Sequence, residues 1–590
     1  MCLNSLLPSF VTASTAASML FIGRSLNQIY TMNVDDPSRR GTDHLFTQLS
    51  QLAALEHPLD TATFSRTIMD LRHFLSRTTL QRLLPPTKVL EALQLLRDFF
   101  LLRRGEFAVA LTHQADEKLR SRWRRAENLA YEKRDGLGTV AVKEGEVAAV
   151  LARTWAAMGS MQGEHAEEDE GVELARDLLR LTLTKSTSST PITSSATEGG
   201  LSSIAPTPFR NLLFSVPVVL TLQIPSPLDL FLTQSDLQTY TAINSYLLSL
   251  RRAQIRLTDL WKLTSLRRHH PAPPAPPYGS TRGGKEKVLL FRQRHTSRSN
   301  ILRNAWATAS AAIFFLGETE SYLQTEVVAG LTEGFHQWLL TGQDSPRQDR
   351  IPSRPKSTLP LDHDDNEEKD GGEGDYGDRG DRGDRGDDIW FAATVPSSSS
   401  SPGTSHNDEE DTPHRLPHDP QTLATAHRRY LRALARRLLL TRQSFTDALY
   451  EFLVQIDHLV ALVHRLHSVW TAADLEADVG VVDAFVDLAR EERDVQGEIC
   501  GVEGRVKHGI EGLVAELRRL EAGGVTNWFG GEDGAVDDEG YDETERELGL
   551  REAGQYTPRR VGGVDRLLMK LDFGSWFGIE GKATGIHDDE

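Results

Sequence analysis

The chain has only two cysteines, Cys2 and Cys500, among its 590 residues. Two cysteines cannot build a disulfide framework, and they exclude zinc sites made of several cysteines. Such a composition is typical of a reducing compartment such as the cytosol or the nucleus. The sequence also lacks an apolar run near the ~20 residues that a transmembrane helix needs. Its first basic residue is Arg24, so the N-terminus has no basic start of a signal peptide, and we expect none.

Enzyme signatures are missing as well. The sequence contains no Gly-x-Ser-x-Gly elbow, no Walker loop and no His-Glu-x-x-His pair. His464 and His467 are three residues apart on a predicted helix and could share a metal, but no third ligand follows at a fixed spacing. We therefore expect no catalytic residue, no metal site and no cofactor.

A strongly basic domain is also absent. The net charge is −18, and two segments account for nearly all of it. Asp362–Asp388 contains 13 acidic and 4 basic residues, and Glu532–Glu547 contains 9 acidic and 1 basic residue. The rest of the chain is close to neutral, so no domain is suited to neutralising the phosphates of a nucleic acid. We expect no nucleic-acid partner.

Helical periodicity is what the sequence does contain. From Tyr240 to Trp261, apolar residues recur at alternating steps of three and four, and only Gln254 interrupts them. This spacing places an apolar edge along a long helix that packs against other helices. Similar periodicity predicts helices at Leu90–Leu111 with an interruption at Gly105, and at Leu174–Leu183, Ile301–Leu340, Leu431–Leu466 and Val481–Leu520. Leu431–Leu466 would be the longest, at roughly 50 Å.

Strand patterns are scarce, so the sequence predicts an all-α fold. One β-like run, Leu212–Ile224, contains Pro217, which limits it to an edge strand or an extended connection. Four polar inserts lack the apolar residues that would offset the entropy of ordering them. We expect these inserts to be disordered loops that interrupt one helical body. They cover residues 185–206, 269–287, 343–419 and 523–560.

Arginines gather off the apolar edges of two predicted helices. One group is Arg251, Arg252 and Arg256, and the other lies between His427 and Arg437. Such groups are either the solvated backs of amphipathic helices or docking positions for an acidic protein surface. The sequence leaves both interpretations open.

Four stretches, taken in order, resemble the gamma-tubulin complex component family, whose members share two grip motifs. Leu7–Asn27 is similar to grip motif one, and Leu96–Leu111 to the helix that joins the family's two domains. Pro227–Trp261 resembles the start of grip motif two, and Leu302–Phe335 with Asp419–Leu440 resembles its continuation.

Shorter features within these stretches strengthen the likeness. Phe314-Phe315 and Tyr322-Leu323-Gln324 look like the family's paired aromatics and its Tyr-Leu-Gln segment, and His427, Tyr430 and Leu431 like its His-x-x-aromatic-Leu. Near the end, Leu567–Phe577 resembles the C-terminus of component four, the member to which this chain is most similar.

The resemblance implies an elongated stack of small helical bundles in two domains. Residues 1–92 would be a remnant of the N-terminal domain that contacts neighbouring components sideways, and residues 93–590 the C-terminal domain that binds gamma-tubulin and carries the inserts. The implied role is structural: it helps to assemble a ring or spiral that nucleates microtubules. The implied location is the cytoplasm and cytoskeleton, at a microtubule-organising centre or spindle pole, with no membrane insertion.

The N-terminus departs from the family pattern. The family normally has a long helical region before grip motif one, whereas here that motif starts within the first ten residues. A start placed too late and a truly shortened component would both explain this, and we adopt the misplaced start as our expectation.

By resemblance, seven positions of grip motif two would contact gamma-tubulin: Arg251, Arg252, Arg303, Asn304, Tyr322, Gln324 and Glu326. Four others, Phe314, Phe315, Leu323 and Leu431, are expected to pack the core beneath them, at roughly 1.5–3 kcal/mol each.

Charge reversal at Arg251 and Arg252 together is expected to weaken gamma-tubulin capture and to leave thermal stability unchanged. On physics alone, the same helices also fit a scaffold or tethering subunit without a tubulin partner.

Overall fold

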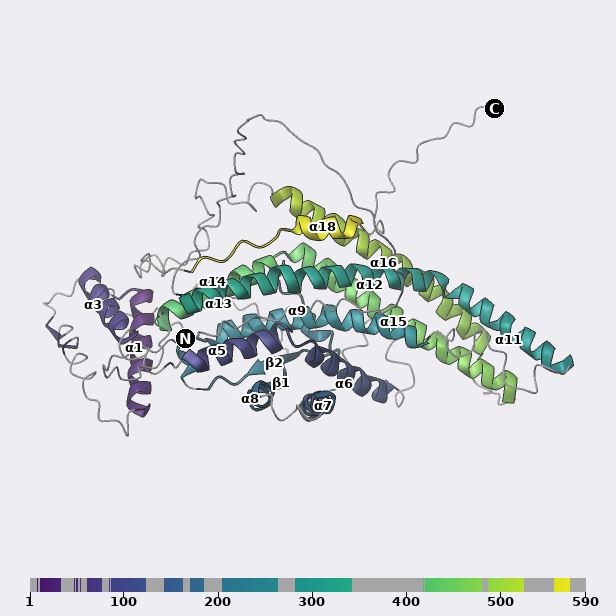
Figure 1. The fold of residues 1–590 in the computed structure, drawn as a ribbon, viewed down its shortest axis with the longest axis horizontal. Coiled ribbons are helices and arrows are strands. Elements are labelled where there is room, and N and C mark those ends of the chain that lie inside the picture. The colour runs from purple at the N-terminus through teal and green to yellow at the C-terminus, as the bar shows by residue number, and fades with distance from the viewer. Residues whose placement is uncertain are drawn as a thin grey trace, which may run out of the picture. The chain divides into compact units, whose positions relative to one another are not determined.

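The structure is a computed structural model that describes only part of the chain. The described residues are 11–32, 61–76, 86–123, 143–162, 170–184, 204–225, 227–263, 282–341, 420–479, 487–524 and 556–573, with single residues or pairs at 8, 47, 49–50, 53–54, 84 and 418. All of them belong to one compact unit, formed by Met1–Asp344 and Arg415–Glu590. Helices dominate these residues, as the periodicity predicts (Figure 1).

The N-terminal part contains a helical pair with a small core of its own. Helix α1 (Ala13–Met32) covers most of the stretch that resembles grip motif one, and it packs against α3 (Thr61–Phe74). The guanidinium of Arg72 donates a hydrogen bond to the Ser18 hydroxyl at 2.9 Å. The core of the pair is formed by Ile22, Ile68, Leu71 and Leu75.

The larger body contains the remaining elements. In chain order they are α5 (Pro86–Leu95), η3 (Leu96–Phe100), α6 (Gly105–Trp123), α7 (Glu144–Gln162), α8 (Glu170–Leu178), β1 (Leu179–Leu183), η6 (Phe209–Asn211), β2 (Val218–Leu222), η7 (Leu228–Leu230), α9 (Gln234–Asp259), η8 (Leu260–Leu263), α11 (Arg282–Ile301), α12 (Arg303–Tyr322), η9 (Leu323–Val328), α13 (Ala329–Thr341), α14 (Pro420–Arg437), α15 (Gln443–Val479), α16 (Leu488–Gly524) and α18 (Val564–Phe573). The segments η3 and η9 are π-helical.

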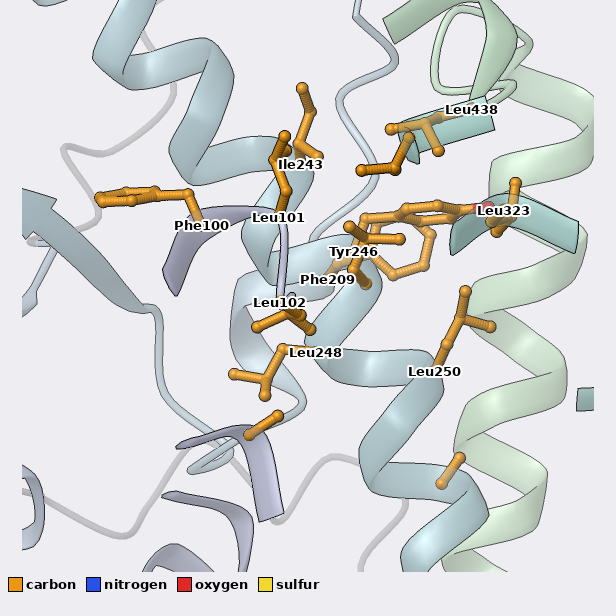
Figure 2. Packing of buried hydrophobic residues seen from close by; sticks show 14 of the residues in the cluster. Phe100, Leu101, Leu102, Phe209, Ile243, Tyr246, Leu248, Leu250, Leu323 and Leu438 are labelled. Carbon is orange, nitrogen blue, oxygen red and sulfur yellow. The ribbon is translucent and has the colours of Figure 1, made fainter. Parts of the chain in front are cut away.

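Helix α9 packs against α6, α12, α14, α15 and β2, and the predicted apolar edge is buried along most of its length. A capping box between Thr233 and Asp236 starts the helix, since each side chain accepts a hydrogen bond from the other residue's backbone N–H. Figure 2 shows Tyr246 next to Phe209, and their rings meet edge to face at 5.2 Å. Tyr246 and Leu248 lie outside the predicted edge but are also buried, because α9 is surrounded by other elements.

One strand replaces the end of a predicted helix. The helix predicted for Leu174–Leu183 is confirmed as far as Leu178, but Leu179–Leu183 is strand β1, so the prediction was wrong there. Leu179 and Leu181 are buried and Arg180 between them is exposed, which is the alternation of a strand. β1 pairs antiparallel with β2, which lies inside the predicted β-like run directly after Pro217. This pair is the only sheet within the described ranges.

The longest predicted helix is also divided. The rhythm from Leu431 to Leu466 continues across a break between α14 and α15, so the prediction of one rod was wrong. Leu438, Leu439 and Leu440 are all buried at this break, and Leu439 has a φ of 62°. The backbone N–H of Ala205 donates to the carbonyl of Leu440 at 2.9 Å. The turn between α14 and α15 thus keeps all three leucines in the core.

The interruption predicted at Gly105 lies immediately before that glycine. Leu102 has a φ of 58°, and α6 then begins at Gly105. Two side-chain amides donate hydrogen bonds to backbone carbonyls at this break. The Asn244 amide of α9 donates to the carbonyl of Phe99 at 3.0 Å, and the Gln324 amide of η9 donates to that of Leu101 at 3.1 Å.

Helix predictions elsewhere are confirmed in outline. Ile301–Leu340 corresponds to α12, η9 and α13, and Val481–Leu520 corresponds to α16. Helix α16 runs for 37 residues despite its glycines. One of them, Gly509, lies where an added Cβ would be 3.1 Å from Cδ2 of Phe452, so it permits close packing of α16 on α15.

The four predicted inserts lie mostly outside the described residues, and their described ends differ from the prediction. Residues 282–287 begin α11, so that insert is shorter than predicted. Tyr556 is buried against α13, where its ring meets Phe335 at 5.3 Å and Trp338 at 5.4 Å. The end of the fourth insert therefore belongs to the packed body.

Candidate partner-binding surface

Arg252 of α9 is part of a group of four charged residues, in which two arginines are buried and two carboxylates are partly buried. Its guanidinium lies 2.8 Å from Asp457 of α15 and 3.2 Å from Asp116 of α6. Arg256, one turn further along α9, contacts the same two carboxylates at 2.5 and 3.6 Å. Burial by itself would raise the pKa of Asp457, but the two arginines outweigh it and hold that pKa below its usual range. These pairs join α9 to two neighbouring helices.

Arg251 points toward a different helix. Its guanidinium donates to Gln254 at 2.7 Å and lies 3.2 Å from the carboxylate of Glu320 on α12. The side chain of Arg251 is 33% exposed. Burial raises the pKa of Glu320, and the attraction of Arg251 only partly opposes this shift. Arg251 therefore has an internal partner but keeps part of its surface open to solvent.

Three predicted contact residues of the α12–η9 segment also make internal contacts. The Tyr322 hydroxyl is buried and donates to the carbonyl of Gly562 at 3.1 Å. Glu326 accepts a hydrogen bond from Arg566 of α18 at 2.8 Å. Gln324 bonds the carbonyl of Leu101 at 3.1 Å. Together these side chains join η9 to the C-terminal segment and to the end of η3.

Burial raises the pKa of Tyr322 to about 12, so its hydroxyl stays protonated and can donate throughout the physiological range. Replacing Tyr322 with phenylalanine is expected to lower the free energy of unfolding by about 1 kcal/mol, because the Gly562 carbonyl loses its donor. Chemical denaturation followed by circular dichroism measures this change.

Tyr246 is the matched control for that substitution. Its hydroxyl is equally buried, but it has no hydrogen-bond partner among the described residues. Tyr246→Phe should therefore leave stability unchanged or raise it slightly. Equal losses in both variants would mean that the Tyr322–Gly562 bond contributes nothing specific.

Arg303 and Asn304 differ from the other five residues that were predicted to contact a partner. Both are exposed in the first turn of α12. Within the described part of the chain, neither side chain has a hydrogen bond or an ion pair. The structure thus leaves two of the seven predicted residues with side chains free to meet a partner, and it ties the other five to neighbouring elements of the chain.

An exposed tryptophan contacts the N-terminal part of the same helix, α12. Trp261 was predicted to extend the apolar edge of α9 into the core, but it is 52% exposed, so that prediction was wrong. The residue lies beyond the end of α9, in η8, where the turn carries it away from the buried side. Its ring stacks on Trp306 of α12 at 5.8 Å. We call Trp261, Arg303, Asn304 and Trp306 the α12 end surface.

Neighbouring ion pairs fix the helix that leads into this surface. Arg294 and Arg298 of α11 both lie 2.7 Å from the carboxylate of Asp474 on α15. The guanidinium of Arg298 also lies over the ring of Trp470, 5.2 Å from its centre. These contacts hold α11 against α15 directly before α12 begins.

The second basic group, on α14, contains one fully buried residue as well as exposed arginines. His427 is fully buried, and its Nε2 lies 3.0 Å from the Tyr240 hydroxyl. Burial lowers the pKa of His427 to about 4, so it is neutral at physiological pH. Arg428 and Arg436 are exposed, whereas Arg437 is partly buried. His427 is therefore a core residue, and the exposed arginines remain compatible with either interpretation.

The four residues predicted to pack the core do so. Phe315 is 0% exposed, and Leu323 and Leu431 are 1% and 3% exposed. Phe314 is partly buried against the same core. Figure 2 shows Leu323 beside Tyr246 in that core. These four core assignments are confirmed, whereas Tyr322 and Arg252, which were predicted to contact a partner, are buried as well.

The described residues also bear on metal sites and membrane spans. Across the described ranges, no three potential metal ligands come together. None of the helices in those ranges is both long enough and apolar enough to span a membrane.

Comparison with known proteins gives one match, to a family model. Residues 89–577 match the model described as gamma tubulin complex component C-terminal. No individual curated protein matches the chain. The matched range includes α9, the charged group around Asp457 and the α12 end surface.

Proposed function

This chain belongs to the gamma-tubulin complex component family, and we propose that its helical body seats gamma-tubulin through the α12 end surface. Members of the family are structural and non-enzymatic, so the chain is not an enzyme. Family membership implies a role in microtubule nucleation, with partners in the gamma-tubulin complex and a location at microtubule-organising centres.

The free side chains of Arg303 and Asn304 are the observation that supports this surface. Interfaces derive most of their binding energy from a few residues, and tryptophan and arginine are prominent among them. Here an exposed tryptophan and an unpaired arginine lie at the ends of two neighbouring helices. The stack of Trp261 on Trp306 orders both rings before a partner arrives, which reduces the entropy lost on binding.

The proposed mechanism is geometric. The buried pairs of Arg252 and Arg256 with Asp116 and Asp457 join α6, α9 and α15, and the Arg251–Glu320 pair joins α9 to α12. A partner seated at the end of α12 would be held at a fixed position relative to the rest of the body. Several such bodies side by side would preorder gamma-tubulins and avoid the entropy of gathering them from solution.

The proposal also covers lateral contacts with adjacent components of the complex and the place of this chain among those components. We propose that the N-terminal pair α1 and α3 belongs to the domain that contacts adjacent components sideways, and that the chain corresponds to component four at a spindle pole. The similarity of Leu7–Asn27 to grip motif one and of Leu567–Phe577 to the component-four C-terminus supports this.

Co-expression of the full chain with gamma-tubulin tests the proposal. A tag on the chain should recover gamma-tubulin in a stable complex on size-exclusion chromatography. A well-folded, helical chain that recovers none would contradict the proposal and would favour a helical scaffold with other partners.

A further inference from the structure

A pocket of about 240 Å³ opens between α5, η3, α9, α13 and α14, away from the α12 end surface. Leu90 and Leu93 line one side, and Phe335 with Tyr430 lines another. The rings of Phe335 and Tyr430 stack at 4.9 Å. An apolar cavity of roughly 150 Å³ is enough to hold a benzene molecule. The pocket therefore has room for one aromatic side chain.

The pocket is also cationic. Arg97 and Arg103 line it, together with His336. The side chain of Arg97 has no ion pair or hydrogen bond within the described ranges. Its positive charge is close enough to the Tyr430 hydroxyl to oppose the burial that raises the pKa of that tyrosine to about 12. Arg103 is 55% exposed, and its contact with Asp98 is long, at 3.5 Å. A ligand for this pocket should combine a ring with negative charge.

The chain itself has such a segment, and that segment ends beside the pocket. Tyr556, the first described residue after position 524, packs its ring on Phe335, which also lines the pocket. The acidic stretch Glu532–Glu547 comes shortly before it, with 9 acidic and 1 basic residue. Tyr541 lies within this stretch, between Glu539 and Asp542.

We propose that Tyr541 inserts into this pocket, with the carboxylates around it paired to Arg97 and Arg103. Tyr541 precedes Tyr556 by 15 residues, a length with a typical span of about 20 Å for a flexible chain and ~50 Å when extended. The tether thus reaches the pocket and supplies the ligand at an effective concentration in the millimolar range.

The other acidic stretch is a weaker candidate because its tethers are longer. Its only tyrosine, Tyr376, lies 35 residues after Thr341 and 42 residues before His418. Effective concentration falls with roughly the −3/2 power of tether length, so Tyr376 would be supplied at a concentration roughly three- to fivefold lower. The observations therefore favour Tyr541.

Photocrosslinking in the full chain tests this contact. With p-benzoylphenylalanine at position 541, the main cross-links should fall within Pro86–Leu95 or Ala329–Thr341. The same analogue at position 376 should give fewer cross-links to these helices. Cross-links at position 541 that scatter over other elements, or that join two chains in proportion to concentration, would overturn the proposal, the latter in favour of a second copy as the occupant.

Charge variants make the test specific. Arg97→Glu should reduce the cross-linking yield about fivefold or more, whereas Arg292→Glu on α11 makes the same charge change at an exposed site and should leave it unchanged. Changing Asp538, Glu539, Asp542 and Glu543 to their amides should reduce the yield similarly and alters no residue of the described body. An unchanged yield in this amide variant would contradict the proposal even if Arg97→Glu failed to fold.

Discussion

Replacing Arg252 with glutamine should lower the free energy of unfolding of the helical body by about 1.5–3 kcal/mol, the usual cost of losing hydrogen bonds to charged groups. The substitution leaves the partly buried carboxylates of Asp116 and Asp457 with Arg256 as the one remaining cation that pairs with them among the described residues. A buried carboxylate without adequate pairing is costly, because burial removes the water that would otherwise solvate it. The loss should appear as a large decrease in the denaturation midpoint.

Arg251→Gln is the matched control on the same helix. Arg251 is 33% exposed and pairs with one carboxylate, so solvent screens the interaction. Its loss should cost about 1 kcal/mol or less. Equal destabilisation by the two substitutions would contradict the distinction between a buried group and a surface pair.

This contrast corrects an expectation based on sequence alone. Charge reversal at Arg251 and Arg252 together was expected to spare stability, but Arg252 is 5% exposed and bonded to two carboxylates. If that double variant lost gamma-tubulin capture, the loss could come from unfolding of the chain as well as from removal of a contact. A test of the interface therefore has to use other residues.

Changing Arg303 to glutamate and Asn304 to alanine should weaken gamma-tubulin binding tenfold or more, which corresponds to about 1.4 kcal/mol. Both side chains are exposed and have no internal partner in the described ranges, so stability should change by no more than about 0.5 kcal/mol. Reversing an interfacial charge both removes an attraction and introduces a repulsion. Titration of gamma-tubulin against the purified variant measures the effect.

Arg153→Glu on α7 provides the control for charge. Arg153 is exposed and lies on a different element, and its reversal changes the net charge by the same amount as that of Arg303. Binding should be unaffected by it. A similar loss in both variants would indicate general electrostatic attraction, and no loss in either would exclude Arg303 and Asn304 from the contact.

The sequence predicts helices well where one face of a segment is buried. The helix prediction fails between α14 and α15. Leu438, Leu439 and Leu440 continue the apolar rhythm through the turn there, so the sequence pattern shows no break. It fails again at Leu179–Leu183, where pairing with β2 decides the conformation of a short leucine-rich segment. Both errors come from tertiary contacts that periodicity does not encode.

At the candidate site, too, the sequence predicts apolar burial but not contacts between distant parts of the chain. Burial of Phe315 and Leu323 was predictable, since these residues lie on apolar helix positions. The partners of Arg252 were not, because Asp116 and Asp457 are 136 and 205 residues away along the chain. The exposure of Trp261 had one signal in the sequence, the neighbouring Lys262, whereas its position beyond the end of α9 is seen only in the structure.

The central claim is that the α12 end surface seats gamma-tubulin on a rigid helical body. Its most direct test is a binding titration with purified gamma-tubulin, comparing the unaltered chain with Trp261→Ala. The account predicts saturable binding by the unaltered chain and at least tenfold weaker binding by the variant, with the same helical signal in both. Absence of binding by a folded, unaltered chain, or equal binding by the two, would contradict it.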